Sequence, residues 1–333
     1  MLPQFGWHAV VTQWEWAPLV TAAALIMAGL YLWGVWRVRR AHPARPWPWH
    51  RTVMFLAGLA VIVIATESGV GAYDDVLFWD HMIQHLMLIM IAPPLLVAAQ
   101  PVTLLLHASR NPLHTGVKKV IRSRVVSFLT WPPFTFCAYT AAIAGTHLTG
   151  LAHETHVNQT LHNAEHVAYL FVGYLFFLPL IGSEPIRWRV SYPLRLLLFA
   201  LAMPVDTFTG LILSYEGAGY ARGVQDPPPP GFPSQVVDVH WAGAVMWIGG
   251  DAIMFGFMMF VVWMWSQDDD RSAELGHGWL AAARSASFEN LTGHRAPGTA
   301  GAGEDMDDDE HLAAYNAYLA QLNGPPGQDA PPG

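Results

Sequence analysis

The chain has 333 residues, of which 53% are hydrophobic and 13% are charged, and its formal net charge is −8. Soluble domains carry about 25% charged residues, so this composition excludes an ordinary soluble domain and favours a polytopic membrane protein. The single cysteine, Cys137, excludes an internal disulfide bond. No convincing basic patch for nucleic acid, Gly-rich phosphate loop or Ser/His/Asp arrangement is present in the sequence.

Seven apolar runs follow one another along the chain, each close to the roughly 20 residues that a bilayer requires. We therefore predict an all-α polytopic bundle with seven transmembrane helices in contact with lipid. The first run is long and has no basic region before it, which indicates a retained helix rather than a cleaved signal peptide. The predicted helices cover residues 17–36, 52–71, 77–98, 125–146, 161–181, 194–215 and 239–265. The third is expected to kink at Pro93-Pro94, because proline lacks a backbone donor.

Basic residues are divided unevenly between the two sets of loops. The loops after the first, third and fifth runs hold nearly all the Lys and Arg of the first 265 positions, whereas the opposite loops hold Arg222. Because Lys and Arg collect in cytoplasmic loops, we predict that the N-terminus is outside and the C-terminus is cytoplasmic. Residues 266–333 are acidic and rich in Gly, Pro and Ala. We expect them to form a mostly disordered cytoplasmic tail after a transmembrane domain at residues 1–265.

Histidines and carboxylates gather at the helix ends that this orientation places outside. His81 and His85 lie near the start of the third run, and His162 and His166 lie near the start of the fifth. Residues four apart share a helix face, so four imidazoles converge if these two helices are neighbours. Neutral imidazole is a common ligand of copper, zinc and iron. The pattern predicts a metal site; the alternative is two polar helix ends that hydrogen-bond to their neighbours.

Further side chains near the same helix ends could complete such a site. A carboxylate could orient an imidazole through its second ring nitrogen. Thioether suits Cu(I), although methionine in a membrane helix is more often plain apolar filling. The segment HETH is one residue short of the HExxH motif of zinc proteases. The candidate auxiliary residues are Asp80, Met82, His153, His156, Glu165, Asp238, His240 and Met246.

Two acids lie much deeper in the predicted helices. Asp206 is in the sixth run and Asp251 is in the seventh, each about a dozen residues from the start of its run. A charge near the middle of a bilayer is costly and usually marks function. One interpretation is an ion or proton relay; the other is helix association through hydrogen bonds.

Three segments resemble the CtaG family, the multispan assembly factors of caa3-type cytochrome c oxidase. The first is HMIQHLMLIMIAPPLLVAAQPVTLLL, which begins at His81, and the second is HNAEH at residues 162–166. The third is D-x-H-x-A-G-x-x-M-W at Asp238–Trp247, which departs from the family by having Val239 where Gln is expected. The resemblance covers roughly residues 20–265.

This resemblance implies a non-enzymatic protein of the bacterial plasma membrane that helps copper to reach the metal centre of a haem-copper oxidase. It implies an oxidase subunit or another copper chaperone as partner. We therefore expect an assembly factor that binds copper, as Cu(I), at an outward-facing site rich in histidine. Two alternatives stay open. Paired histidines on opposed helices also ligate haem or, with carboxylates, di-iron centres, and the deep acids would suit a cation or proton transporter.

Overall fold

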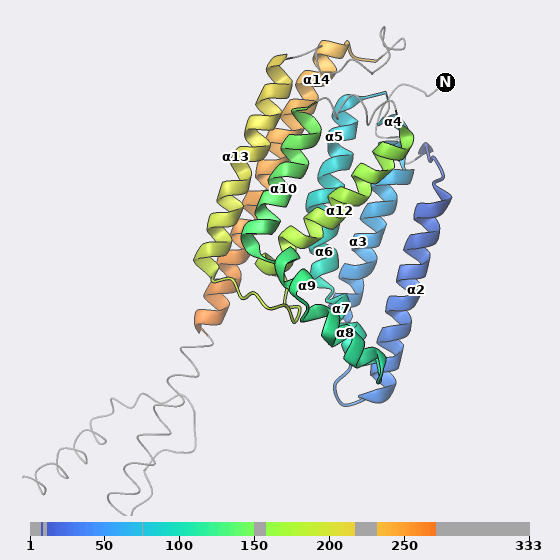
Figure 1. Ribbon diagram of the computed structural model, residues 1–333. Coiled ribbons are helices and arrows are strands. Elements are labelled where there is room, and N and C mark those ends of the chain that lie inside the picture. Colours follow the sequence, from blue (N-terminus) through green and yellow to red (C-terminus); the bar gives the residue numbers. More distant parts are fainter. Residues whose placement is uncertain (1–7, 9–11, 75, 150–157, 217–231, 271–333) are drawn as a thin grey trace, which may run out of the picture. The chain divides into compact units, whose positions relative to one another are not determined.

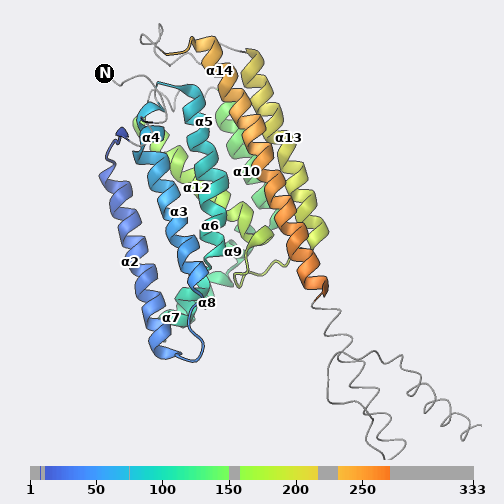
Figure 2. The same cartoon turned by 180° about the vertical axis from the view of Figure 1, so that it is seen from behind.

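The computed structural model describes residues 8, 12–74, 76–149, 158–216 and 232–270, and all regular structure within these ranges is helical (Figures 1 and 2). The predicted all-α bundle is therefore confirmed. The predicted tail and the loop that holds His153 and His156 lie outside the described residues, apart from the tail's first five positions. The described elements are α2 (Pro18–Ala41), α3 (Trp49–Glu67), α4 (Gly69–Tyr73), α5 (Phe78–Leu86), the π-helical segment η1 (Met87–Ile91), α6 (Ala92–Ala98), α7 (Pro101–Ala108), α8 (Leu113–Ile121), α9 (Arg124–Leu129), α10 (Pro132–His147), α12 (Gln159–Ile181), α13 (Tyr192–Glu216), α14 (Gln235–Ala244) and the π-helical segment η3 (Val245–Gly249).

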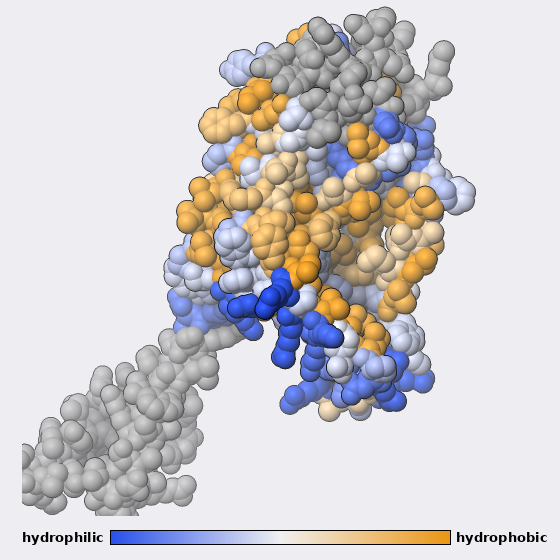
Figure 3. Space-filling view, in the orientation of Figure 1, coloured by the Kyte–Doolittle hydropathy of each residue, from blue (hydrophilic) through white to orange (hydrophobic). Residues whose placement is uncertain are grey.

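Six continuous helical stretches within the described ranges are long and apolar enough to cross a membrane. They overlap six of the seven predicted spans. Apolar side chains cover much of the visible surface between more hydrophilic ends (Figure 3), as lipid contact requires. The six stretches are Pro18–Ala41, Trp49–Tyr73, Phe78–Ala108, Gln159–Ile181, Tyr192–Tyr215 and Gln235–Asp270.

The fourth predicted span, residues 125–146, is divided into α9 and α10 rather than forming one helix. Pro132 and Pro133 begin α10, and neither has the N–H that would continue the hydrogen bonds of α9. α10 packs against α12 and α13 inside the bundle. Its 16 residues correspond to about 24 Å of helix, so the count of seven spans stays a prediction.

The third span is irregular just before Pro93-Pro94, and the kink expected at these prolines stays a prediction. The helix changes from α to π geometry over η1, immediately before these prolines. Proline cannot donate to the carbonyl four residues earlier, so Pro93 leaves the Ile89 carbonyl without its usual α-helical donor. A second break follows at Gln100, which has a left-handed φ of 53° and precedes α7.

α12 crosses close to this irregular segment because it has a glycine at the crossing point. A Cβ on Gly173 would lie 2.3 Å from the Ile89 carbonyl oxygen and 2.8 Å from Pro93 Cγ. Any larger residue would therefore push α12 away from η1 and α6. This approach holds α12 against η1 and α6, and both predicted histidine pairs lie at the same end of the bundle.

Hydrogen bonds join the start of α14 to the start of α5. Both carboxylate oxygens of Asp238 accept backbone hydrogen bonds, from Phe78 N at 2.8 Å and Trp79 N at 3.1 Å. The first N–H groups of a helix have no partner within the helix, so this carboxylate acts as a cap supplied by a neighbouring helix. It fixes the rotation of α5 and with it the direction of the histidines that follow.

We call the end of the bundle with His81 and His162 the histidine end, and the end with Lys118 and Arg187 the basic end. The basic end is the one predicted to be cytoplasmic, and this orientation stays a prediction. The chain divides into two units, residues 1–262 and 263–333. The described part of the second unit continues the last helix to Asp270, and the predicted boundary at residue 265 also stays a prediction.

Candidate metal centre

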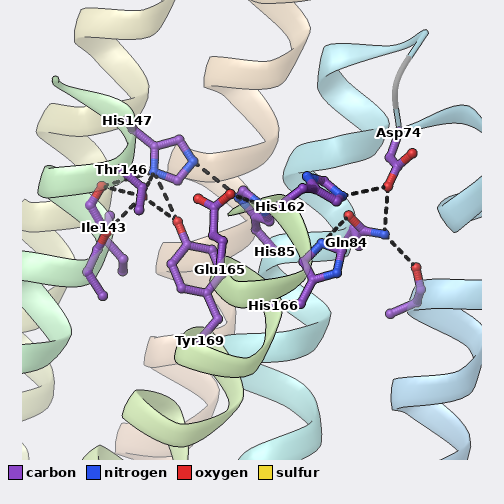
Figure 4. Close-up of polar contacts among 12 residues, drawn as sticks. Asp74, Gln84, His85, Ile143, Thr146, His147, His162, Glu165, His166 and Tyr169 are labelled. Carbon is purple, nitrogen blue, oxygen red and sulfur yellow. Dashed lines mark hydrogen bonds and ion pairs between the residues drawn. The ribbon is translucent and has the colours of Figure 1, made fainter. Parts of the chain in front are cut away.

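The structure brings the four predicted metal-binding histidines together at the histidine end, and Figure 4 shows His85, His162 and His166 among them. The ring centroids of His81 and His85 are 4.0 Å apart on α5, and those of His162 and His166 are 4.2 Å apart on α12. Across the two helices, His81 and His162 are 5.3 Å apart, and His85 and His166 are 6.2 Å apart. All four side chains are buried. The spacing in the sequence therefore identified one common cluster of rings.

Two groups of potential ligands can be distinguished within this cluster. The first, which we call the His81 group, consists of His81, His85 and Glu165, and its ligand atoms lie within 4.8 Å of one another. His85 Nε2 is 4.0 Å from Glu165 Oε2. A metal–nitrogen bond is about 2.0–2.1 Å long, so small side-chain movements would bring these atoms around one ion.

The second, which we call the Asp74 group, consists of Asp74, His162 and His166, also with ligand atoms within 4.8 Å. Its members are already joined by hydrogen bonds. Asp74 Oδ2 accepts from Gln84 Nε2 at 3.0 Å and contacts His162 Nε2 at 3.2 Å. A metal ion in this group would have to replace these bonds, which makes it the weaker candidate of the two.

Gln84 organises the Asp74 group, and its amide orientation follows from its neighbours. The amide nitrogen donates to the Ala65 carbonyl at 2.9 Å and to Asp74 at 3.0 Å. The amide oxygen is then the acceptor that faces His166 Nε2 at 2.9 Å. Neutral imidazole has one N–H, so His166 carries it on Nε2 and keeps its lone pair on Nδ1.

His147, at the end of α10, orients His85 in the same manner. His147 Nδ1 lies 2.9 Å from the Ile143 carbonyl oxygen, which can only accept, so this nitrogen carries the hydrogen. His147 Nε2 is then an acceptor, and His85 Nδ1 donates to it at 3.3 Å. The lone pair of His85 is consequently on Nε2, the atom that faces Glu165. Metal-binding histidines are usually held by such a bond from their other nitrogen.

Comparison with known proteins supplies a family match. The profile of the family described as cytochrome c oxidase caa3 assembly factors matches residues 29–268. The chain belongs to this family. All four central histidines, and every described auxiliary residue and deep acid predicted from the sequence, lie within the matched region of this family member.

Mycobacterial relatives of this assembly-factor family member are longer. This chain is 31% identical over 326 residues to uncharacterised proteins of Mycobacterium bovis and Mycobacterium tuberculosis. The aligned region covers 94% of this chain and 45% of each relative. The chain is 30% identical over 273 residues to an uncharacterised protein of Mycobacterium leprae, covering 79% of this chain and 41% of that one. The chain thus spans less than half the length of these relatives. No solved structure matches it.

The auxiliary residues of this family member fall into different environments. Glu165 joins the His81 group, whereas Asp238 caps α5 and His240 is exposed on α14. Asp80 is buried, and within the described ranges neither of its carboxylate oxygens has a hydrogen-bond partner. Met82 and Met246 are buried beside the cluster and line a small cavity.

The two deep acids lie on facing helices, and each accepts a hydrogen bond from a hydroxyl group. Tyr139 donates to Asp206 at 3.4 Å, and Thr207 donates to Asp251 at 2.7 Å. Asp206 is 0% exposed. A Cβ on Gly250 would lie 3.3 Å from Asp206 Cβ, so the glycine allows the last helix to pass close to α13 at this point.

Sequence reasoning did not assign three residues that shape the site. Gln84 lies inside the segment HMIQH, three residues after His81, and that spacing already indicated a shared helix face. Asp74 lies in the turn after α4, and its role depends on tertiary contacts. His147 has no histidine four residues away, so no local pattern marks it.

Proposed function

We propose that this protein assists the assembly of a caa3-type cytochrome c oxidase in the bacterial plasma membrane by binding copper at the His81 group. The bound copper would pass to an oxidase subunit or to another copper chaperone. One observation carries the proposal: His147 holds His85 Nδ1, so that the lone pair on His85 Nε2 faces the group formed with His81 and Glu165.

The donor atoms and the family together favour copper. Two imidazoles and a carboxylate suit copper, zinc or iron, so the ligands alone leave the metal open. Membership in the family of caa3 oxidase assembly factors favours copper, because the oxidase that this family serves is a haem-copper oxidase. A site with three protein ligands also leaves a coordination position for transfer to a partner.

The Asp74 group supports the His81 group from the side of α12. Its hydrogen bonds fix His162 at a ring-centroid distance of 5.3 Å from His81. Fixed neighbours restrict the rotamers of a ligand, so less conformational entropy is lost when the metal binds. Asp74, His162 and His166 therefore influence copper affinity mainly through the placement of the His81 group.

Metal analysis of the purified protein in detergent, with an absorption spectrum on the same sample, tests this function. We expect copper in the wild-type protein and the loss of one copper equivalent in His81→Ala/Glu165→Gln. His240→Ala is the matched control, because His240 is an exposed histidine at the same end of the bundle, and it should keep all copper. Unchanged copper in the double variant would contradict the proposal, and a Soret band would favour the haem alternative.

A further inference from the structure

A small cavity lies beside the His81 group. On one side the lining residues form a single stripe along α5 and η1, with the spacing i, i+3, i+4, i+7 and i+8 that marks one helix face. The other side is formed by α10, α12, α13 and η3. The cavity is lined by Met82, His85, Leu86, Ile89, Met90, Ile143, His147, Tyr169, Asp206 and Met246.

Three of the lining residues carry soft donors. Met82, Met90 and Met246 supply three thioether groups, and the rings of His85 and His147, which are hydrogen-bonded to each other, border the same space. Thioether is a typical ligand of Cu(I), whereas the hard cations prefer oxygen donors. Met82, Met90 and Met246 are between 0% and 4% exposed, so their side chains lie inside the protein and not on its surface.

Plain apolar filling explains the methionines by themselves, but it does not explain Asp206. This carboxylate is 0% exposed and lines the same cavity. Tyr139 donates to Oδ2, while Oδ1 has no hydrogen-bond partner among the described residues. A buried polar atom without a partner is costly. A cation in the cavity would give this oxygen the partner that it lacks among the described residues.

The helix geometry also changes where it borders the cavity. η1 contains Ile89 and Met90, and η3 contains Met246, so π-helical turns flank the cavity from two different helices. Single π-helical turns within α-helices often occur at functional sites. The prolines after η1 account for the first of them, whereas η3 has no proline and extends to Gly249.

We propose that this cavity is a second copper site, specific for Cu(I) and rich in thioether, and that His85 connects it to the His81 group. His85 belongs to both sites: Nε2 faces Glu165, and the ring also borders the cavity. Met90 lies five residues after His85, which corresponds to about 8 Å along the helix axis. The ion would move inward along this face without a change of oxidation state. The transfer step rests on the proposed function, whereas binding in the cavity does not.

Titration of the purified protein with Cu(I) under anaerobic conditions, against a competing Cu(I) chelator, tests the proposal together with X-ray absorption at the copper edge. We expect two copper equivalents in the wild-type protein, one of them with sulfur scattering. Met82→Leu/Met246→Leu should bind one equivalent without sulfur scattering, since leucine keeps the side-chain volume. Met254→Leu is the matched control, because Met254 is buried in the last helix but does not line the cavity; it should keep both.

Two results would overturn the second site. One is the absence of sulfur scattering from copper bound to the wild-type protein, a result that does not depend on the folding of any variant. The other is a Met82→Leu/Met246→Leu protein that keeps two equivalents and the sulfur signal. His81→Ala/Glu165→Gln separates this proposal from the function above. This variant should keep the sulfur-bound ion and lose the other ion. If it keeps both ions, the His81 group is not a copper site, and the proposal for the cavity is unaffected.

Discussion

The two ends of the bundle each bury carboxylates, but they surround them with different donors. At the histidine end, Asp74 and Glu165 face imidazoles. At the basic end, Glu184 accepts from the backbone N–H groups of Val102 and Thr103, both at 2.9 Å, and from the Thr103 hydroxyl. Glu184 thereby caps α7, a structural task that needs no ligand. Burial of an acid does not indicate a functional site by itself; the chemistry of its neighbours does.

The largest expected effect concerns the residue shared by both proposed copper sites. His85→Ala removes an imidazole from the His81 group and also removes the wall of the cavity that the same ring forms. We expect this single change to abolish tight copper binding, measured as copper per chain after purification and Cu(I) titration. Full copper content in His85→Ala would show that neither site depends on this ring.

A smaller effect is expected from the residue that orients His85. His147→Leu removes the acceptor for His85 Nδ1, and the loss of such a supporting bond lowers metal affinity by about 10–100-fold. His147→Gln offers an amide oxygen to the same N–H and should restore much of the affinity. Equal losses in both variants, read from competition with a chelator, would assign His147 a ligand or packing role instead.

The Asp74 group should matter less than the His81 group. His166→Ala leaves the His81 group intact and removes the partner of the Gln84 amide oxygen. We therefore expect copper to remain bound, with a smaller loss of affinity than in His147→Leu. Isothermal titration of the two variants side by side makes the comparison. A complete loss of copper in His166→Ala would instead favour one site built from all four histidines.

At the basic end, the same kind of change should affect stability and leave copper unchanged. Glu184→Gln keeps one acceptor oxygen where three donors converge, and we expect it to lower the free energy of unfolding by about 1–2 kcal/mol. Thermal unfolding in detergent measures this. Loss of copper from Glu184→Gln would break the distinction between the two ends.

The smallest expected effect is the pH dependence of that stability. Burial raises the pKa of Glu184 above its ordinary value, more than its hydrogen bonds lower it. The folded protein then binds a proton more tightly at this site than the unfolded chain does, so stability falls as pH rises above the ordinary glutamate pKa of about 4.3. Glu184→Gln should flatten this slope in a series of unfolding curves, whereas an unchanged slope would assign it to other groups.

Much of the bundle and the central cluster follows from local patterns in the sequence. Apolar length located six spans, and the four-residue spacing of His81 and His85 and of His162 and His166 marked two faces that meet. The division of α9 from α10 was missed because the run of apolar residues outweighed Pro132-Pro133. Gln84 and His147 act through partners far away in the chain, and no spacing rule detects such bonds.

The central claim is that the His81 group holds copper, and the Met82→Leu/Met246→Leu protein tests it most directly because it should contain that site alone. X-ray absorption of this variant after Cu(I) loading should show one copper bound by nitrogen and oxygen, with imidazole scattering and no sulfur. Absence of bound copper, or copper without imidazole scattering, would contradict the account.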